Sequence, residues 1–396
     1  MKLPLTVDAI TPQWLSEALG ERHRGLTVTH VEIMDIILGT STKIRVRPTY
    51  AYSGAGGKAL PDTLIVKGGF EEHSPSMQPM YLNEMRFYRE VQPRIDMHSP
   101  ACYFAGTDPD SHQSIVIMED LRARGVQFCN ALRPQAYDQV ARRLEAMAIY
   151  HAQTWNSVEF QPGGAFDWVT GRHESWSVEY QHRYLAPEVW RHYMESPRGA
   201  AVSRVLQDRH WMARALGYLG RYHQHSPVCL CHGDTHLGNL YIDAGKPGFF
   251  DAQVTKGPWQ LEVTYHIIAA LDIHDRRLWE KDLLRHYLRA LGAQGIGAPS
   301  FETAWESHRR EIVYGLFIFL INEVRFQTEA INTAYAARSG RARRVLPGCS
   351  NSVAAGNLAG LRTGPATCWP PSAYRISPLT NAASSAARNT AAPPIS

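Results

Sequence analysis

The sequence predicts an α+β protein with two lobes, a small β-rich N-lobe and a larger, mostly helical C-lobe. Strand-like runs and turn residues alternate over about the first hundred residues, and longer helical periods follow. A chain of 396 residues can bury a core in each lobe. We assign residues 1–120, with an N-terminal helix, to the N-lobe and residues 121–338 to the C-lobe. Residues 339–396, rich in Ala, Ser, Pro and Arg, are expected to be a disordered tail.

After its N-terminal helix, the N-lobe is predicted to contain a hairpin, two further strands and a second helix. β-branched and aromatic residues predict strands at 27–37, 44–52, 63–66 and 114–118. The first two flank a small polar turn at residues 38–43, so they are expected to pair. The third ends at Lys67, and residues 80–91 have the apolar spacing of a helix.

The C-lobe prediction rests on long helical periods. Residues 138–155 place their large apolar side chains on one face, and residues 317–337 are predicted to form a further helix. The apolar run 312–321 is about half of the roughly 20 residues that a membrane helix needs, so it indicates a buried helix. Residues 157–225 are enriched in aromatic residues. They either line a pocket for a partly apolar substrate or form an aromatic core, which is the commoner use.

Composition argues against several classes of protein. The formal net charge is +4, but residues 341–396 hold six arginines and no acid, so 4 − 6 leaves −2 for the rest. A slightly acidic body without basic runs predicts no nucleic-acid partner. The N-terminus has no secretory signal and the chain has no membrane span, so we expect a cytoplasmic protein. The six cysteines form no CxxC pair, which predicts reduced, mostly buried thiols.

Residues 229–253, CLCHGDTHLGNLYIDAGKPGFFDAQ, hold the most informative group of reactive side chains. The part HGDTHLGN, residues 232–239, is too rich in glycine and polar residues to be a helix. Residues 240–243 and 248–250 are strand-like on either side of a turn. We therefore expect a loop followed by a hairpin that brings Asp251 back beside the loop.

Two chemistries fit this segment. Asp234, Asn239 and Asp251 can supply one base toward a hydroxyl and two oxygen ligands for Mg²⁺, which are the parts that phosphoryl transfer needs. The alternative is a zinc-dependent hydrolase, in which His232 and His236 join Asp234 in binding Zn²⁺. The chain offers no second HxH or HExxH group, so phosphoryl transfer is the favoured interpretation.

At these residues the sequence resembles the aminoglycoside phosphotransferase and choline kinase-like family, over roughly residues 30–335. The motif HGDTHLGN matches that family's HGDxHxGN catalytic loop at every fixed position. The resemblance implies a protein-kinase-like fold, with ATP between the lobes. It also implies that Asp234 is the catalytic base, Asn239 a Mg²⁺ ligand, and Asp251 the aspartate that holds Mg²⁺ on the phosphates.

The resemblance further implies how the N-lobe would cover the nucleotide. Lys67, in LIVK, would contact the α- and β-phosphates, and Glu84 would hold this lysine in an ion pair. The turn over the phosphates would be Gly39, Thr40, Ser41 and Thr42, which could equally be only a hairpin turn, and the hinge at the adenine would include Met118, Glu119 and Leu121. His232 is expected to hold the loop by bonds to backbone, and His236 to face the phosphates or to pack.

The predicted activity is therefore ATP- and Mg²⁺-dependent transfer of the γ-phosphate to a hydroxyl of a small molecule. The aromatic segment favours a partly apolar acceptor over a polycationic aminoglycoside, for which a ring of acids would be expected. A catalytically silent, nucleotide-binding protein is the alternative. Two residues depart from the family pattern, Ala252 in place of an aromatic residue and Glu262 in place of an aspartate, but neither is a base or a metal ligand. The acceptor's identity and the oligomeric state are left open.

Overall fold

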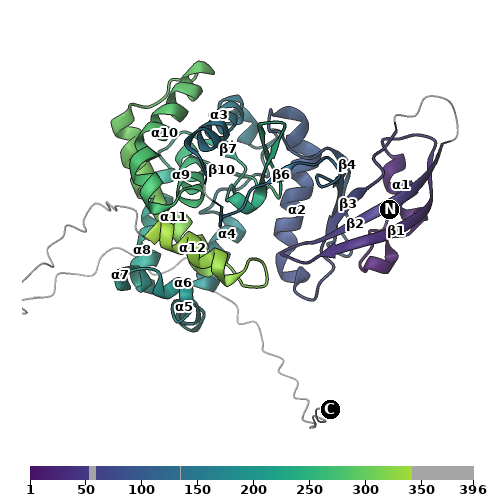
Figure 1. Ribbon diagram of the computed structural model, residues 1–396, viewed down its shortest axis with the longest axis horizontal. Helices are drawn as coiled ribbons and strands as arrows, with labels where there is room; N and C mark the ends of the chain where they lie inside the picture. The colour runs from purple at the N-terminus through teal and green to yellow at the C-terminus, as the bar shows by residue number, and fades with distance from the viewer. Residues whose placement is uncertain (53–58, 134, 341–396) are drawn as a thin grey trace, which may run out of the picture. The chain divides into compact units, whose positions relative to one another are not determined.

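The computed structural model describes residues 1–52, 59–133 and 135–340, which form a small β-rich N-lobe and a larger, mostly helical C-lobe (Figure 1). This confirms the predicted α+β class. The last helix continues through Ser339 and Gly340. The rest of the predicted tail, residues 341–396, lies outside the described residues.

Five antiparallel strands form the N-lobe sheet, in the order β1-β2-β3-β5-β4. Their bounds are Leu26–Ile37 (β1), Thr42–Tyr52 (β2), Leu64–Gly68 (β3), Cys102–Thr107 (β4) and Ser114–Glu119 (β5). The four predicted strands are confirmed, and β4 is an additional edge strand that the sequence pattern did not indicate. The expected hairpin is the β1–β2 pair.

Two helices pack against this sheet. Helix α1 (Pro12–Gly20) has proline in its first turn and the Thr11 side chain as its N-cap, and it buries Trp14 and Leu15 in the N-lobe core. Helix α2 (Gln78–Arg86) contacts β4 and β5 and continues as a π-helical turn, Phe87–Val91. Short 3₁₀ turns complete the lobe at Val7–Ala9, Ser74–Met77 and Gln92–Arg94.

The C-lobe is mostly helical. Its helices are α3 (Tyr137–Gln153), α4 (Ser175–Tyr184), α5 (Pro187–Met194), α6 (Pro197–Ala200), α7 (Arg204–Gln207), α8 (Arg209–His223), α9 (Trp259–Ala270), α10 (Ile273–Ala293), α11 (Phe301–Ile321) and α12 (Glu329–Gly340), with 3₁₀ turns at Val158–Phe160 and Leu237–Asn239. Its short strands are β6 (Gln127–Phe128), β7 (Cys229–Cys231), β8 (Leu240–Asp243), β9 (Lys246–Phe249) and β10 (Thr255–Gly257). The predicted loop and hairpin are thus present, with β8 and β9 pairing across a tight turn.

Helix α9 separates two apolar clusters and is buried along its whole length. The first cluster joins α9 to α3, α10 and the strand β7 that enters the loop of residues 232–239. The second joins α9 to α5, α8, α11 and α12. Since the helix is buried on all sides, it lies in the interior of the lobe and contributes to both clusters, and its polar side chains Glu262, Thr264 and His266 are hydrogen-bonded there.

The predicted helix over 317–337 is wrong, because the chain leaves helical geometry between α11 and α12. Asn322 is extended, with φ −66° and ψ 127°. The buried side chain of Asn332 donates to the backbone oxygens of Asn322 and Gln327 at 3.2 and 2.9 Å, and Arg198 also donates to the Asn322 oxygen. Side-chain bonds of this kind replace helical ones, and they fix a turn at residues 322–328.

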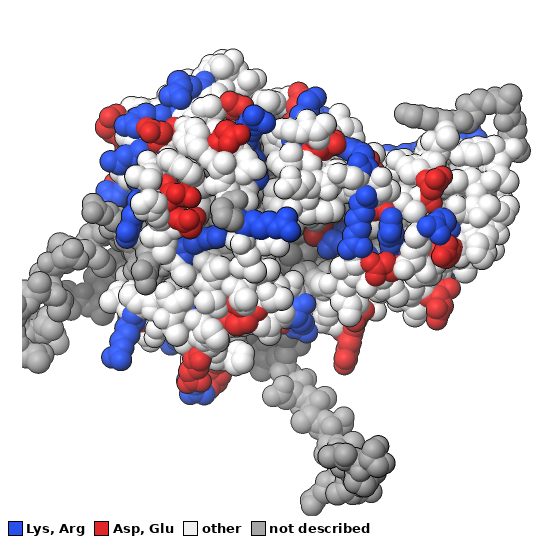
Figure 2. Space-filling view, viewed as in Figure 1, with Lys and Arg blue, Asp and Glu red and all other residues white. Residues whose placement is uncertain are grey.

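The charged side chains on the surface are mixed in sign, and the described cysteines are free thiols, as expected of a globular protein. Figure 2 shows Lys and Arg side chains intermixed with Asp and Glu on one face of the molecule, and the absence of a nucleic-acid partner stays a prediction. No helix within the described ranges is long and apolar enough to cross a membrane. In the described part of the chain all cysteines are free thiols, and Cys229 and Cys231 are buried.

Candidate phosphotransfer site

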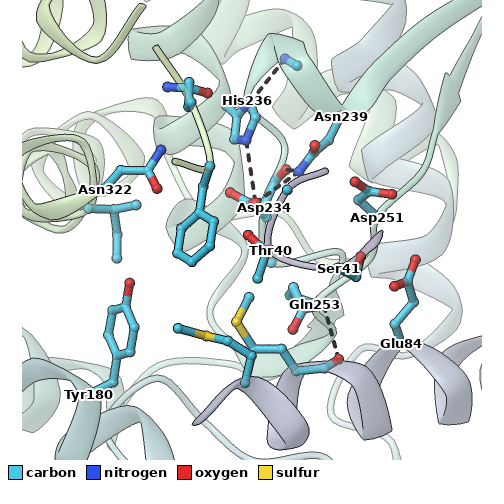
Figure 3. A pocket seen from close by; sticks show the side chains of 18 of the residues that line it. Thr40, Ser41, Glu84, Tyr180, Asp234, His236, Asn239, Asp251, Gln253 and Asn322 are labelled. Carbon is cyan, nitrogen blue, oxygen red and sulfur yellow. Dashed lines mark hydrogen bonds and ion pairs between the residues drawn. The ribbon is translucent and has the colours of Figure 1, made fainter. Parts of the chain in front are cut away.

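A cavity of about 350 Å³ lies between the lobes and contains most of the predicted site residues. Its lining includes Gly39, Thr40, Ser41, Lys67, Glu84, Asp234, His236, Asn239 and Asp251. Figure 3 shows Asp234 between two sides, with Glu84 and Asp251 on one and Tyr180 and Asn322 on the other. Segments that are far apart in the sequence therefore meet around one carboxylate.

Lys67 lies at the centre of the N-lobe side. It stands near the end of β3, is only 4% exposed, and its Nζ is 2.5 Å from the Glu84 carboxylate and 2.7 Å from Asp251 Oδ1. Burial lowers the pKa of Lys67, but the two carboxylates outweigh burial and raise the pKa overall. The lysine is therefore a fixed positive charge that joins α2 to the loop after β9.

Asp251 holds an unusual backbone conformation for a residue with a side chain. Its φ is +58°, in the left-handed region that costs about 1–3 kcal/mol at a non-glycine residue. Lys67 and Lys43 both contact its carboxylate, Lys43 Nζ at 3.0 Å from Oδ2. Burial raises the pKa of Asp251, but the two lysines outweigh it and hold the pKa well below the usual range. Asp251 is therefore an ionised oxygen donor at the mouth of the hairpin.

Asp234 is held from three directions, although its side chain is 30% exposed. Its Oδ1 accepts a hydrogen bond from the Tyr265 hydroxyl at 2.9 Å, and its Oδ2 accepts one from Asn239 Nδ2 at 2.9 Å. His236 Nε2 lies 3.5 Å from Oδ2 (Figure 3). Burial raises the pKa of Asp234, but His236 and Tyr265 lower it to about 2. Such a carboxylate is ionised at neutral pH and can orient a hydroxyl group.

His232 lies below the loop with a defined proton position. Its Nε2 is 3.1 Å from the carbonyl oxygen of Phe250, which can only accept, and its Nδ1 is 3.3 Å from the donating N–H of Asp234. The ring therefore carries its proton on Nε2. Burial lowers the pKa of His232, which keeps the imidazole neutral. The side chain links the loop of residues 232–239 to Phe250, the residue before Asp251.

The backbone conformation at position 233 requires a glycine. Its φ is +85°, and a Cβ added there would lie 2.0 Å from the carbonyl oxygen of Gln253. Arg172 fills the remaining space, donating to the carbonyl oxygens of Gly233 and Gln253 at 2.6 and 3.1 Å. The loop that carries Asp234 and the segment after Asp251 are thus tied together by one guanidinium group.

Glu262 anchors the other side of the loop from α9. Its carboxylate accepts hydrogen bonds from the backbone N–H groups of His232 and Gly233, both at 3.2 Å. It also binds the Tyr150 hydroxyl and His151 Nε2, each at 2.8 Å. Burial lowers the pKa of His151, but its contacts with Cys231 and Glu262 raise it to about 9, so Glu262 and His151 form a buried ion pair. Glu262 thus acts on the backbone of the loop rather than on the cavity.

The remaining predicted nucleotide contacts lie at different distances from the cavity. Gly39, Thr40 and Ser41 line it, and the Thr40 carbonyl oxygen accepts a hydrogen bond from the Tyr81 hydroxyl at 2.5 Å. Thr42 is buried in β2 and is not among the lining residues. The hinge residues Met118, Glu119 and Leu121 lie at and just after the end of β5, also outside the lining that the described residues form.

The geometry disfavours the zinc alternative. Within the described ranges, the one His, Cys, Asp or Glu group whose ligand atoms converge is His151, Cys229 and Cys231, in the core below the loop. Both nitrogens of His151 already take part in hydrogen bonds, to Glu262 and to the Tyr287 hydroxyl. His232 uses both of its nitrogens on backbone groups, so it does not converge with His236 on a shared ion.

The donor set fits Mg²⁺ better. Asp251 and Asn239 both line the cavity, and Asn239 uses its Nδ2 to bind Asp234, so its Oδ1 remains for a cation. Hard divalent cations prefer oxygen donors of this kind. In this structure, Lys43 and Lys67 together neutralise the negative charge of the Asp251 carboxylate.

Sequence reasoning missed Lys43, Arg172, Tyr265 and the backbone contacts of Glu262. These residues come from β2, from the segment before α4, and from α9. Each is a common residue type without a motif of its own. Only Glu262 carried a signal, since it stands where the resembled family has an acid.

The two-lobed architecture and the site between the lobes define the class of small-molecule kinases with a protein-kinase-like fold. A family model described as the ecdysteroid kinase-like family matches residues 40–294. The match covers more than half of the chain, so the chain belongs to the ecdysteroid kinase-like family. A comparison with the curated proteins finds no match.

Solved structures with a similar arrangement include an ethanolamine kinase from Plasmodium vivax. It is 11% identical, with 78% of this chain and 80% of that chain covered and a TM-score of 0.49. An aminoglycoside phosphotransferase from Streptomyces rimosus is 10% identical, with 76% and 97% covered and a TM-score of 0.44. At these values the likenesses carry no argument about the activity of this chain.

Proposed function

We propose that the protein transfers the γ-phosphoryl group of ATP to a hydroxyl group of a small, partly apolar molecule, in a reaction that needs Mg²⁺. The single observation that carries the proposal is the meeting of Asp234, Asn239, Asp251 and Lys67 at one cavity. Phosphoryl transfer depends on positioning and on neutralising charge more than on covalent chemistry. These four side chains are the groups that such a reaction requires.

Each residue has a role in this proposal. Asp234, ionised and oriented by Tyr265 and Asn239, accepts a hydrogen bond from the acceptor hydroxyl. It takes the hydroxyl proton as the oxygen becomes bonded to the γ-phosphorus, while the bond from that phosphorus to the β–γ bridging oxygen breaks and ADP leaves. Lys67 binds the α- and β-phosphates. Asn239 and Asp251 would hold Mg²⁺, which supplies charge neutralisation on the phosphates when bound.

The acceptor side of the cavity supports an uncharged, partly apolar substrate. It is formed by α4, α11 and the turn at 322–328, and its side chains are Trp176, Tyr180, Gln181, Ile318, Phe319, Asn322, Phe326 and Gln327. Among the described lining residues the only carboxylates are Glu84, Asp234 and Asp251, all on or at the phosphate side. A polycation would find no acidic wall there.

Aromatic rings with a few amide and hydroxyl groups suit a hydroxylated apolar molecule. An ecdysteroid, the compound class in the family's description, is a molecule of this kind. The segment at 157–225 contributes both to the cavity lining, through Trp176 and Tyr180, and to the core, through Trp190 and Tyr193; its use as a pocket for a partly apolar substrate is part of this proposal.

Calorimetry with the full chain tests the nucleotide part of the proposal. ATP is titrated with and without Mg²⁺ into the wild type, Asp251→Asn, and the control Asp282→Asn, which removes a 65% exposed acid on α10. We expect binding that requires Mg²⁺, weakens in Asp251→Asn and is unchanged in the control. A folded wild type that binds no ATP would overturn the proposal.

The acceptor part has a separate readout. ADP release is measured with hydroxylated steroids and with aminoglycosides as acceptors. We expect turnover with an uncharged apolar acceptor. Turnover with an aminoglycoside alone would contradict the acceptor assignment while leaving the phosphotransfer assignment in place.

A further inference from the structure

Strand β2 brings a second lysine to the phosphate side of the cavity. Lys43 lies directly opposite Lys67 in the register of β2 and β3. Directly opposed side chains project from the same face of a sheet, and like charges in that arrangement repel. The two ammonium groups are held together by Asp251, at 3.0 Å from Lys43 and 2.7 Å from Lys67.

Lys43 and Lys67 differ in the ion-pair partner that each would keep if Asp251 bound another group. Lys67 keeps Glu84, a buried partner at 2.5 Å. For Lys43, Asp251 is the one ion-pair partner within the described part of the chain. If Asp251 turns its oxygens to Mg²⁺, Lys43 is left as an uncompensated cation with a side chain 26% exposed at the cavity.

The neighbours of Lys43 on β2 show that its position is specific. Arg45 and Arg47 follow at alternate positions and so project from the same face. Arg45 is paired with Asp120 at 2.5 Å and Arg47 with Glu32 at 2.8 Å. Neither lines the cavity, so Lys43 is the member of this row that a ligand between the lobes can reach.

We propose that Lys43 is a second phosphate-binding lysine, which neutralises Asp251 before nucleotide binds and contacts the terminal phosphates of the nucleotide afterwards. The inference rests on the proposed function, because it needs a nucleotide in the cavity. A polyphosphate beside the two opposed lysines would supply the counter-charge that Lys43 loses when Asp251 turns to Mg²⁺, while Lys67 keeps Glu84. Lys43 also follows the turn at Gly39–Ser41, where the phosphates would lie under the N-lobe.

Calorimetry on the full chain with Mg²⁺ tests this role through a series of nucleotides. ATP, ADP and AMP are titrated into the wild type, Lys43→Gln and the control Arg47→Gln, which removes a positive charge from the same strand. We expect Lys43→Gln to weaken ATP binding by about tenfold or more and to leave AMP binding unchanged. The control should match the wild type for every nucleotide.

Equal effects on ATP and AMP in Lys43→Gln, or no effect on ATP, would overturn the role. A wild type that binds no nucleotide would sink the proposed function and this inference together, whereas an unchanged Lys43→Gln beside a binding wild type sinks this inference alone. A second measurement needs no variant: acetylation of Lys43 in the wild type, followed by mass spectrometry. Protection by MgATP but not by AMP is expected, and equal labelling under both conditions contradicts the proposal.

Discussion

Replacing Glu262 should remove much of the stability of the C-lobe, although the residue does not line the cavity. Four donors converge on its carboxylate, three of them buried (the His232 N–H, the Tyr150 hydroxyl and His151 Nε2) and one half-buried (the Gly233 N–H). In Glu262→Ala all four lose their acceptor. Water cannot easily replace it, because Glu262 is 2% exposed.

The magnitude follows from two overlapping arguments. Three buried donors and one half-buried donor left without an acceptor, at about 1 kcal/mol or more each, give a loss of roughly 4 kcal/mol. Breaking the buried ion pair between Glu262 and His151 by removing one partner costs about 3–5 kcal/mol by itself. A typical domain has only about 5–15 kcal/mol of unfolding free energy, so a loss of about 4 kcal/mol in Glu262→Ala would remove a large part of it. Glu262→Gln keeps one oxygen acceptor and should lose about half as much, roughly 2 kcal/mol.

The pH dependence of the unfolding free energy distinguishes the contribution of the Glu262–His151 ion pair from that of the hydrogen bonds to Glu262. The pKa of His151 is about 9 in the folded protein against 6.5 as the ordinary value. A group whose pKa is raised by folding stabilises the fold fully below its unfolded pKa. The contribution of His151 is therefore complete below pH 6.5 and lost as the pH rises through about 9. The difference in stability between wild type and Glu262→Gln should shrink over that window.

Urea unfolding followed by circular dichroism measures these differences. The control is Glu145→Gln, which removes the acid from a surface pair with His286, also at 2.8 Å but with Glu145 50% exposed. Exposed pairs contribute about 0–1 kcal/mol, so the control should stay near the wild type. A Glu262→Ala variant that loses no more than this control would refute the reasoning.

Two further predictions concern the backbone of the site. Gly233→Ala should abolish ATP-dependent turnover, because its Cβ would lie 2.0 Å from the Gln253 oxygen at a φ of +85°; unimpaired kinetics in this variant would show that the loop can relax. Arg198→Met should cost about 1.5–3 kcal/mol in urea unfolding, since Arg198 is 1% exposed and loses its charged hydrogen bonds, while its partner Glu329 is 27% exposed and can be solvated. The variant should also raise the KM for the acceptor, because Arg198 donates to the backbone oxygen of Asn322, which lines the acceptor side of the cavity. An unchanged KM would contradict this role of Arg198.

The residues that could be found from the sequence are those that lie close together along the chain. Asp234 and Asn239 are five positions apart in one loop, and the strand-turn-strand pattern that follows was enough to bring Asp251 back beside them. Local spacing and a tight turn fix such an arrangement before any tertiary packing is considered.

The residues that were missed depend on packing between distant elements. Lys43 is one lysine in a strand with several basic residues, and only its register with β3 sets it apart. Tyr265 reaches Asp234 because α9 passes beneath the loop, which no local pattern indicates. The break after Ile321 has the same origin, since the amide of Asn332 comes from the next helix. Tertiary contacts therefore decided these positions against local propensity.

The position of α9 between two separate clusters has a consequence for how relatives of this protein can diverge. Substitutions in the cluster of α5, α8, α11 and α12 would alter the packing behind the acceptor side of the cavity. Substitutions in the cluster of α3, α10 and β7 would alter the packing behind the loop of Asp234. If the proposed function holds, acceptor preference can change through substitutions on one side of α9, while selection for phosphoryl transfer conserves the other side. Homologous sequences should accordingly show two rates of change within a single lobe, with α9 itself among the slowest segments.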